Sequence, residues 1–87
     1  MYVFTLRNGN RKRGQVLYSV YSESLLTDRV RKIANRIFLG EFKIDEYSFI
    51  DLEKNGRLLK TIYALDDGTF SDCDFDSMEN YCRDLEG

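Results

Sequence analysis

Two groups of basic residues are the first candidates for chemistry in this sequence. One is a run of three cations between Gly9 and Gly14, and the other is a set spaced three and four residues apart, which would share one ridge of a helix. Phosphate groups attract such cations by releasing condensed counterions, so both patterns are typical of nucleic-acid binding. An isoelectric point of about 5.1 favours instead a solvated loop and an ordinary polar helix face. The basic loop is Arg11, Lys12 and Arg13, and the basic ridge is Arg29, Lys32 and Arg36.

The C-terminal segment carries the opposite charge. Residues 66–87 hold eight Asp or Glu and one Arg, a net charge of −7, whereas residues 1–43 hold nine Lys or Arg and three Asp or Glu, a net charge of +6. The two ends either neutralise each other or present separate surfaces to partners, and the sequence leaves both arrangements open. The acidic group expected to contact a partner is Asp66, Asp67, Asp72, Asp74, Asp76 and Glu79.

Three of these acids have the spacing that opens an EF-hand calcium loop, Asp72-x-Asp74-x-Asp76. The remainder of the motif is missing, because position 6 is Ser77 where Gly is needed and position 12 is Arg83 where a bidentate Glu is needed. We therefore expect no metal site. The acids then serve helix capping and solubility, or contact a basic groove on a nucleic-acid enzyme.

Catalytic motifs are scarce. The chain has no His, which excludes imidazole-dependent triads, the usual zinc hydrolase ligand sets and His-based acid–base chemistry. Asp28 with Glu41-x-Lys43 loosely resembles the acids of metal-dependent nucleases, but Asp28 is expected on a helix where those sites use a strand end. A carboxylate pair acting as acid and base stays open in principle. We expect a protein that is not an enzyme and needs no cofactor.

These residues are positioned by elements that the hydrophobic pattern predicts. Tyr2–Arg7 and Gln15–Tyr21 alternate as strands do and predict a hairpin. The polar segment Asn8–Gly14 between them is expected to be a loop that carries the basic loop residues into water. A helix from about Ser24 to Leu39 follows, since six apolar residues recur at helical spacing. The six are Leu26, Val30, Ile33, Ala34, Ile37 and Phe38.

A second hairpin is predicted over Tyr47–Leu65, because Asn55-Gly56 stands between two alternating runs and is a strong signal for a two-residue turn. That turn sets Asp51 opposite Lys60, and it buries the face that carries Leu52.

The remaining segment is predicted to hold a turn and a helix. Asp66–Gly68 is expected to form the turn, followed by a short strand at Thr69–Ser71. A final helix is expected over Ser77–Leu85, with Asp76 and Glu79 as an acidic capping box. The element order predicts an α+β fold. We expect a mainly antiparallel sheet of four to five strands in ββαββ(β)α order, with helices packed on one face.

Size and composition are consistent with one domain, residues 1–87, since 43% of the residues are apolar. No window approaches the roughly 20 apolar residues of a membrane span, and the start of the chain does not resemble a secretory leader. Two cysteines are too few for a disulfide framework. We expect a cytoplasmic protein with no membrane partner.

The functional prediction is a non-enzymatic, protein-binding inhibitor or modulator. Its composition is typical of small accessory proteins of phages and mobile elements, and its expected partner is a host protein that handles nucleic acid, bound through charged surfaces. The alternative is a module that binds nucleic acid directly through the basic loop and the basic ridge. Whether the basic or the acidic surface is the functional one stays open.

Overall fold

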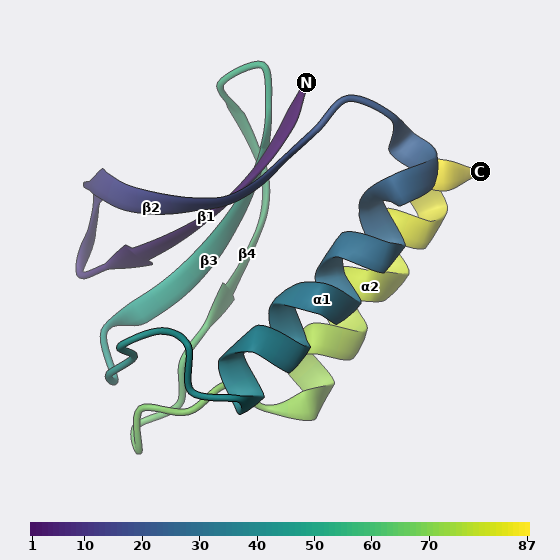
Figure 1. Ribbon diagram of the computed structural model, residues 1–87. Coiled ribbons are helices and arrows are strands. Elements are labelled where there is room, and N and C mark those ends of the chain that lie inside the picture. Colours follow the sequence, from purple (N-terminus) through teal and green to yellow (C-terminus); the bar gives the residue numbers. More distant parts are fainter.

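A computed structural model describes all 87 residues and confirms the ββαββα order and the α+β class. A single 3-10 turn, Glu23–Leu25, precedes the first helix. Four strands form one sheet, and both helices cover the same face of it (Figure 1). The elements are β1 (Tyr2–Asn8), β2 (Asn10–Val20), α1 (Leu26–Phe38), β3 (Ser48–Lys54), β4 (Arg57–Tyr63) and α2 (Asp72–Glu86).

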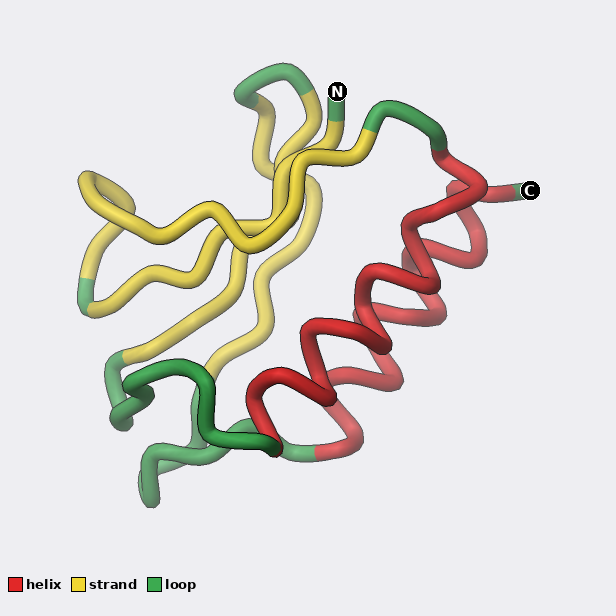
Figure 2. The backbone as a smooth tube through the Cα atoms, in the orientation of Figure 1, coloured by secondary structure: helices red, strands yellow, loops and turns green.

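The sheet is antiparallel throughout, with the strand order β2-β1-β3-β4. The two predicted hairpins therefore join through their first strands, β1 and β3. The helices α1 and α2 run side by side in opposite directions, so the end of α1 and the start of α2 lie together (Figure 2). The other face of the sheet, which no helix covers, is called the open face below. Neither helix has the length and apolar composition needed to cross a membrane.

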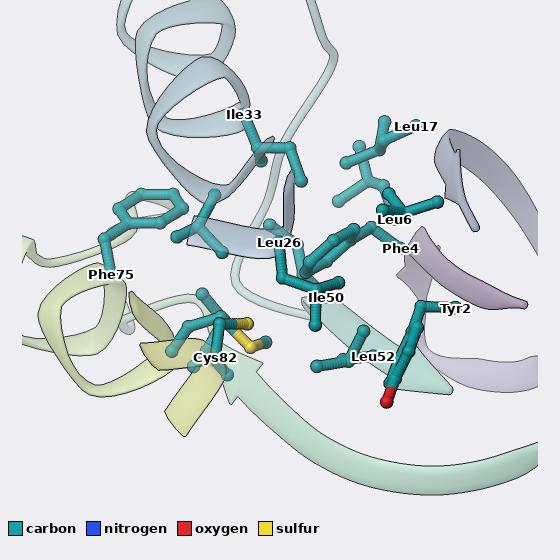
Figure 3. Close-up of a cluster of buried hydrophobic side chains, with 14 of the residues drawn as sticks. Tyr2, Phe4, Leu6, Leu17, Leu26, Ile33, Ile50, Leu52, Phe75 and Cys82 are labelled. Carbon is teal, nitrogen blue, oxygen red and sulfur yellow. The ribbon is translucent and has the colours of Figure 1, made fainter. Parts of the chain in front are cut away.

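A single cluster of buried side chains fills the space between the sheet and the helices (Figure 3). Alternate residues of the central strands point into it, as the period of two requires. Cys82 belongs to this cluster, and burial raises the pKa of its thiol to about 12, so it is a core residue with no reactive thiolate. The fully buried members include Phe4, Leu26, Ile50, Leu52, Met78 and Cys82.

The second hairpin has the predicted turn, but its register differs from the prediction. Asn55 and Gly56 both have positive φ angles, 51° and 82°, as this turn requires. A β-bulge between Leu52 and Glu53 then adds one residue to β4, so Asp51 pairs with Thr61 rather than with Lys60. The predicted pairing of Asp51 with Lys60 is therefore wrong, whereas the predicted burial of Leu52 is confirmed.

The segment Asn8–Gly14 is not the loop that the sequence predicts. β1 extends to Asn8 and β2 begins at Asn10, so the turn is centred on Gly9 alone, whose φ is 78°. The basic loop residues consequently lie within β2. The pairing is irregular there, because the register shifts between Leu6 and Asn8 and leaves Arg11–Gly14 of β2 opposite Arg7 alone.

The turn at Asp66–Gly68 is present, but the short strand predicted after it is not. Asp67 accepts hydrogen bonds from the N–H of Thr69 at 3.0 Å and from its hydroxyl at 2.7 Å. The N–H of Leu65 donates to the carbonyl oxygen of Thr69 at 2.7 Å, which folds the chain back on itself. Phe70 enters the core instead of extending the sheet, so the sheet keeps four strands.

The helix α2 begins more than one turn earlier than predicted. Its N-cap is Ser71, whose hydroxyl oxygen accepts a hydrogen bond from the N–H of Asp74 at 3.1 Å. Ser71 and Asp74 have the spacing of a capping box with an acid at its third helical position. The capping box predicted at Asp76 and Glu79 is wrong, because both residues lie inside the helix.

Candidate functional site

Arg11 is held against the open face of the sheet rather than standing free in water. Its Nε atom donates to Asp51 Oδ2 at 3.0 Å, and its guanidinium lies over the ring of Phe49 at 4.9 Å. A second guanidinium nitrogen donates to the hydroxyl of Thr61 at 3.1 Å. The sequence missed this arrangement, because it depends on the curl of the hairpin over the sheet and on the bulge that sets Thr61 beside Asp51.

Asp51 is the centre of a network on the open face and is fully buried. It accepts hydrogen bonds from Arg7 Nε at 3.0 Å and from the Thr61 hydroxyl at 2.6 Å, in addition to the bond from Arg11. Arg7 also donates to Glu53 at 2.7 Å. The network joins all four strands, β1, β2, β3 and β4. Every charge in it has a partner, so it leaves little free charge for a ligand.

The basic ridge exists as predicted, but each of its three cations has an acidic partner. Arg29 and Lys32 both pair with Asp28, and Arg36 pairs with Glu41 at 3.3 Å. The hydrogen bond from Lys32 holds the pKa of Asp28 below its usual value. Four of the six predicted basic site residues thus have internal ion pairs, and only Lys12 and Arg13 have none.

A single ion pair, between Arg31 and Glu79, joins the basic N-terminal half of the chain to its acidic C-terminal segment. Glu79 in α2 accepts from Arg31 Nε in α1 at 2.6 Å and from Arg83 at 3.0 Å. The hydrogen bond from Arg31 lowers the pKa of the Glu79 carboxyl. The other ion pairs of the basic half use acids from outside the acidic group, so the two ends do not neutralise each other.

The acidic group divides into structural acids and free acids. Asp67 and Asp74 hold the turn and the helix cap described above, and Glu79 joins the helices. In contrast, Asp66, Asp72 and Asp76 are exposed and have no ion pair.

Two of the free acids border exposed apolar side chains at the end of α1. Phe38 and Leu39 are 61% and 79% exposed. Asp72 and Asp76 line a groove of about 400 Å³ between the helices, and Phe38 forms part of the same groove. We call these four residues the acidic–apolar patch.

The patch continues into a second depression on the other side of Phe38. This depression has a volume of about 310 Å³, and five of its seven lining residues are apolar. The ring of Phe38 packs edge-on against Phe75, with 6.0 Å between the ring centroids, and so separates the two depressions. The exposed apolar surface therefore has hollows on both sides that a partner side chain can enter. The apolar lining residues are Ile37, Phe38, Phe42, Ile44 and Phe70.

The sequence placed Phe38 on one face of the helix with five other apolar residues, and in the structure Phe38 is the exposed member of that face. The helical period does bring it to the same side as Leu26 and Ile33, which are buried. At position 38 only the start of α2 is available to cover it, and the contact with Phe75 covers one edge of the ring. The dipeptide Phe38-Leu39 before Gly40 was the available signal, because the helix ends there and adjacent residues of a helix face directions about 100° apart.

The chain assembles no metal-binding cluster of three or more His, Cys, Asp or Glu. The three acids with calcium-loop spacing lie in α2, where Asp72 and Asp76 share one face of the helix and Asp74 points away from it. Comparisons with protein-family models, curated proteins and solved structures find no match. We therefore infer the function from the surfaces of the molecule.

Proposed function

We propose that this chain is a non-enzymatic interaction protein that binds a basic protein partner through the acidic–apolar patch. The observation that carries the proposal is the 61% exposure of Phe38 in the groove that the unpaired carboxylates of Asp72 and Asp76 also line. Leu39, the next residue in the chain, is 79% exposed. Large apolar side chains that stand together on a small protein mark binding surfaces. The acids beside them select a partner of positive charge.

The arrangement resembles the anatomy of a protein interface. Binding energy in such interfaces is concentrated in a few central side chains, and polar residues surround them and exclude water. Phe38 and Leu39 supply the apolar centre, and the depressions on both sides of Phe38 accept side chains of the partner. The carboxylates at the edge speed association and fix the orientation more than they add affinity.

A partner that handles nucleic acid fits this chemistry. Such proteins carry basic grooves for phosphates, and an acidic surface docked there competes with the nucleic acid. We therefore propose an inhibitor or modulator of a nucleic-acid-handling protein. A phage or mobile-element source and a cytoplasmic location stay predictions from the composition.

Direct nucleic-acid binding through the six predicted basic residues is the less favoured proposal. Four of the six already have acidic partners within the fold, and releasing counterions from a phosphate backbone needs free cations. Only Lys12 and Arg13 remain, and of these only Arg13 lines a pocket.

The proposal is tested by affinity capture from cells of the natural source with matched variants. The double variant Phe38→Ser/Leu39→Ser should bind the captured partner about 30-fold more weakly, as expected when a hot spot worth about 2 kcal/mol is removed. Asp76→Asn should weaken binding less and should reduce its salt dependence. The control is Tyr21→Ser, which removes a side chain that is 84% exposed beyond the opposite end of α1.

Three results would decide against the patch. These are equal capture by the double variant and the wild type, loss of capture in Tyr21→Ser, and a partner whose affinity does not change with salt. Far-ultraviolet circular dichroism and thermal unfolding of each variant show whether a loss of binding comes from loss of the fold. Because Phe38 and Leu39 are exposed, Ser at these positions should leave the fold intact.

A further inference from the structure

A second surface feature lies away from the acidic–apolar patch, between the β1–β2 hairpin and the loop that precedes β3. It is a pocket of about 350 Å³. This volume is within the range of small-ligand sites in proteins. Its polar lining residues are Arg7, Asn8, Arg13, Gln15, Lys43 and Ser48.

The pocket has an uncompensated positive charge. Three of its lining residues are cations and none is an acid. Arg7 is already neutralised, because it pairs with Asp51 and Glu53. Arg13 and Lys43 have no ion-pair partner anywhere in the chain, so no carboxylate contacts either of these two cations directly.

The acid on the loop beside Lys43 is Asp45, which is close enough to feel the charge of Lys43 but forms no ion pair with it. Asp45 accepts hydrogen bonds from the side-chain amide of Asn8 at 2.9 Å and from the N–H of Tyr47 at 2.8 Å. The bond from Asn8 is the main reason that the pKa of Asp45 is lowered. Gln15 has an amide with no hydrogen-bond partner in the protein, so its donor is free for a ligand.

The wall that carries Arg13 is anchored to β1 by Arg7 and by close packing at Gly14. The guanidinium of Arg7 donates to the carbonyl oxygens of Arg11 at 2.9 Å and of Arg13 at 3.5 Å, which holds the backbone of β2 in place. Gly14 lies so close to β1 that a Cβ atom there would stand 2.5 Å from Thr5 Cγ2. Arg13 and Gln15 therefore project from a strand that is anchored to β1, which reduces the entropy that these two side chains lose on binding, whereas Lys43 projects from the loop before β3.

We propose that this pocket binds a phosphate monoester, with Arg13 and Lys43 as its charged contacts and Gln15 as a neutral donor. A phosphate monoester carries about −1.5 to −2 charges at pH 7, which matches the two free cations, whereas a phosphodiester carries one. Arginine presents a fork of donors that suits phosphate oxygens, and lysine adds a point charge. This site is independent of the proposed docking patch.

Two sources can supply the same chemical group. One is a free nucleoside 5′-monophosphate, and the other is the 5′-phosphorylated end of a nucleic-acid strand. The volume of the pocket accommodates the phosphate and part of the attached sugar in either case. The experiment below separates the two sources.

The test is titration of the full chain, followed by nuclear magnetic resonance of the backbone amides. The probes are inorganic phosphate, adenosine 5′-monophosphate, and one single-stranded oligonucleotide with and without its 5′-phosphate. Phosphate-bearing probes should shift the amides of residues 13–15 and 43–48. If adenosine monophosphate shifts these amides, the ligand of the pocket is a free nucleotide. If only the 5′-phosphorylated strand shifts them, the ligand is the end of a nucleic-acid strand.

Matched variants distinguish a built site from general attraction of anions. Arg13→Gln and Lys43→Gln should each weaken binding about 10-fold, the scale of one lost charge-assisted hydrogen bond. Arg57→Gln removes an exposed cation that also has no ion pair but lies at the β3–β4 turn, and it should bind as the wild type does.

Three outcomes would overturn the proposal. They are no shift with any probe, equal weakening in Arg57→Gln, and equal binding of the oligonucleotide with and without its terminal phosphate. Arg13, Lys43 and Arg57 are exposed, so the variants should unfold at the temperature of the wild type.

Discussion

The variant Asp51→Ala should unfold with a free energy about 3–5 kcal/mol lower than that of the wild type, the usual cost of breaking a buried ion pair from one side. Asp51 is fully buried, although it lies on the face of the sheet that no helix covers. Its removal leaves the guanidinium of Arg7, whose side chain is only 15% exposed, without its central partner. The Thr61 hydroxyl also loses its acceptor. Urea denaturation at pH 7 measures the difference.

Two further variants separate the burial of Asp51 from simple loss of charge. Asp51→Asn keeps an acceptor oxygen of nearly the same shape, so its cost should fall between zero and that of Asp51→Ala. Glu53→Ala removes the other partner of Arg7 but leaves its bond to Asp51, and it should cost about 1 kcal/mol or less. If Asp51→Ala and Glu53→Ala cost the same, the network does not stabilise the sheet in the way described.

The variant Gly14→Ala should be destabilised by about 1–3 kcal/mol, the range for overpacking of a well-packed site. The cause is a steric clash and not an unfavourable backbone conformation, because the φ angle of Gly14 is not positive. Its added Cβ would stand 2.5 Å from Thr5 Cγ2, 3.0 Å from Arg7 Cγ and 3.1 Å from the carbonyl oxygen of Leu6. Thr5 is buried and β-branched, so it has little freedom to move aside. Thermal unfolding with a two-state fit measures the cost.

A double-mutant cycle tests this cause. Thr5→Ser deletes the methyl group that the new Cβ would meet and keeps the hydroxyl. In the Thr5→Ser background, Gly14→Ala should lose most of its cost, which gives a coupling energy of about 1 kcal/mol or more. Additive effects of the two substitutions would show that the close approach of β2 to β1 is not what requires glycine.

The parts of the fold that the sequence predicted are those fixed by neighbours along the chain. Asn55-Gly56 sets the second turn because both residues accept positive φ angles. The spacing of Leu26, Val30 and Ile33 sets the buried face of α1. These local signals were sufficient for the element order and for the α+β class.

The parts that were missed depend on contacts between distant segments. Bulges shift the register in both hairpins, and the alternation of apolar and polar residues does not predict where a strand contains an extra residue. The buried position of Asp51 follows from that register. Arg11 is held by the same network, so a run of basic residues that looked free in the sequence contains a structural side chain.

The candidate site was predicted in part. The free acids Asp72 and Asp76 belong to the predicted acidic group, and their helical context was missed because Ser71 caps the helix one turn earlier. The exposure of Phe38 and Leu39 could not be read from periodicity, since the period states which side of a helix a residue faces but not how far the covering elements extend. Lys43 entered the pocket only through the folding of the loop before β3.

Site-specific photocrosslinking in cells of the natural source measures most directly where the partner binds. A photoreactive amino acid in place of Leu39, the most exposed apolar residue of the acidic–apolar patch, should form a covalent adduct with one basic partner. The same amino acid in place of Tyr21, which is equally accessible but distant, should form none. An adduct from position 21 in the absence of one from position 39 would contradict docking through the patch.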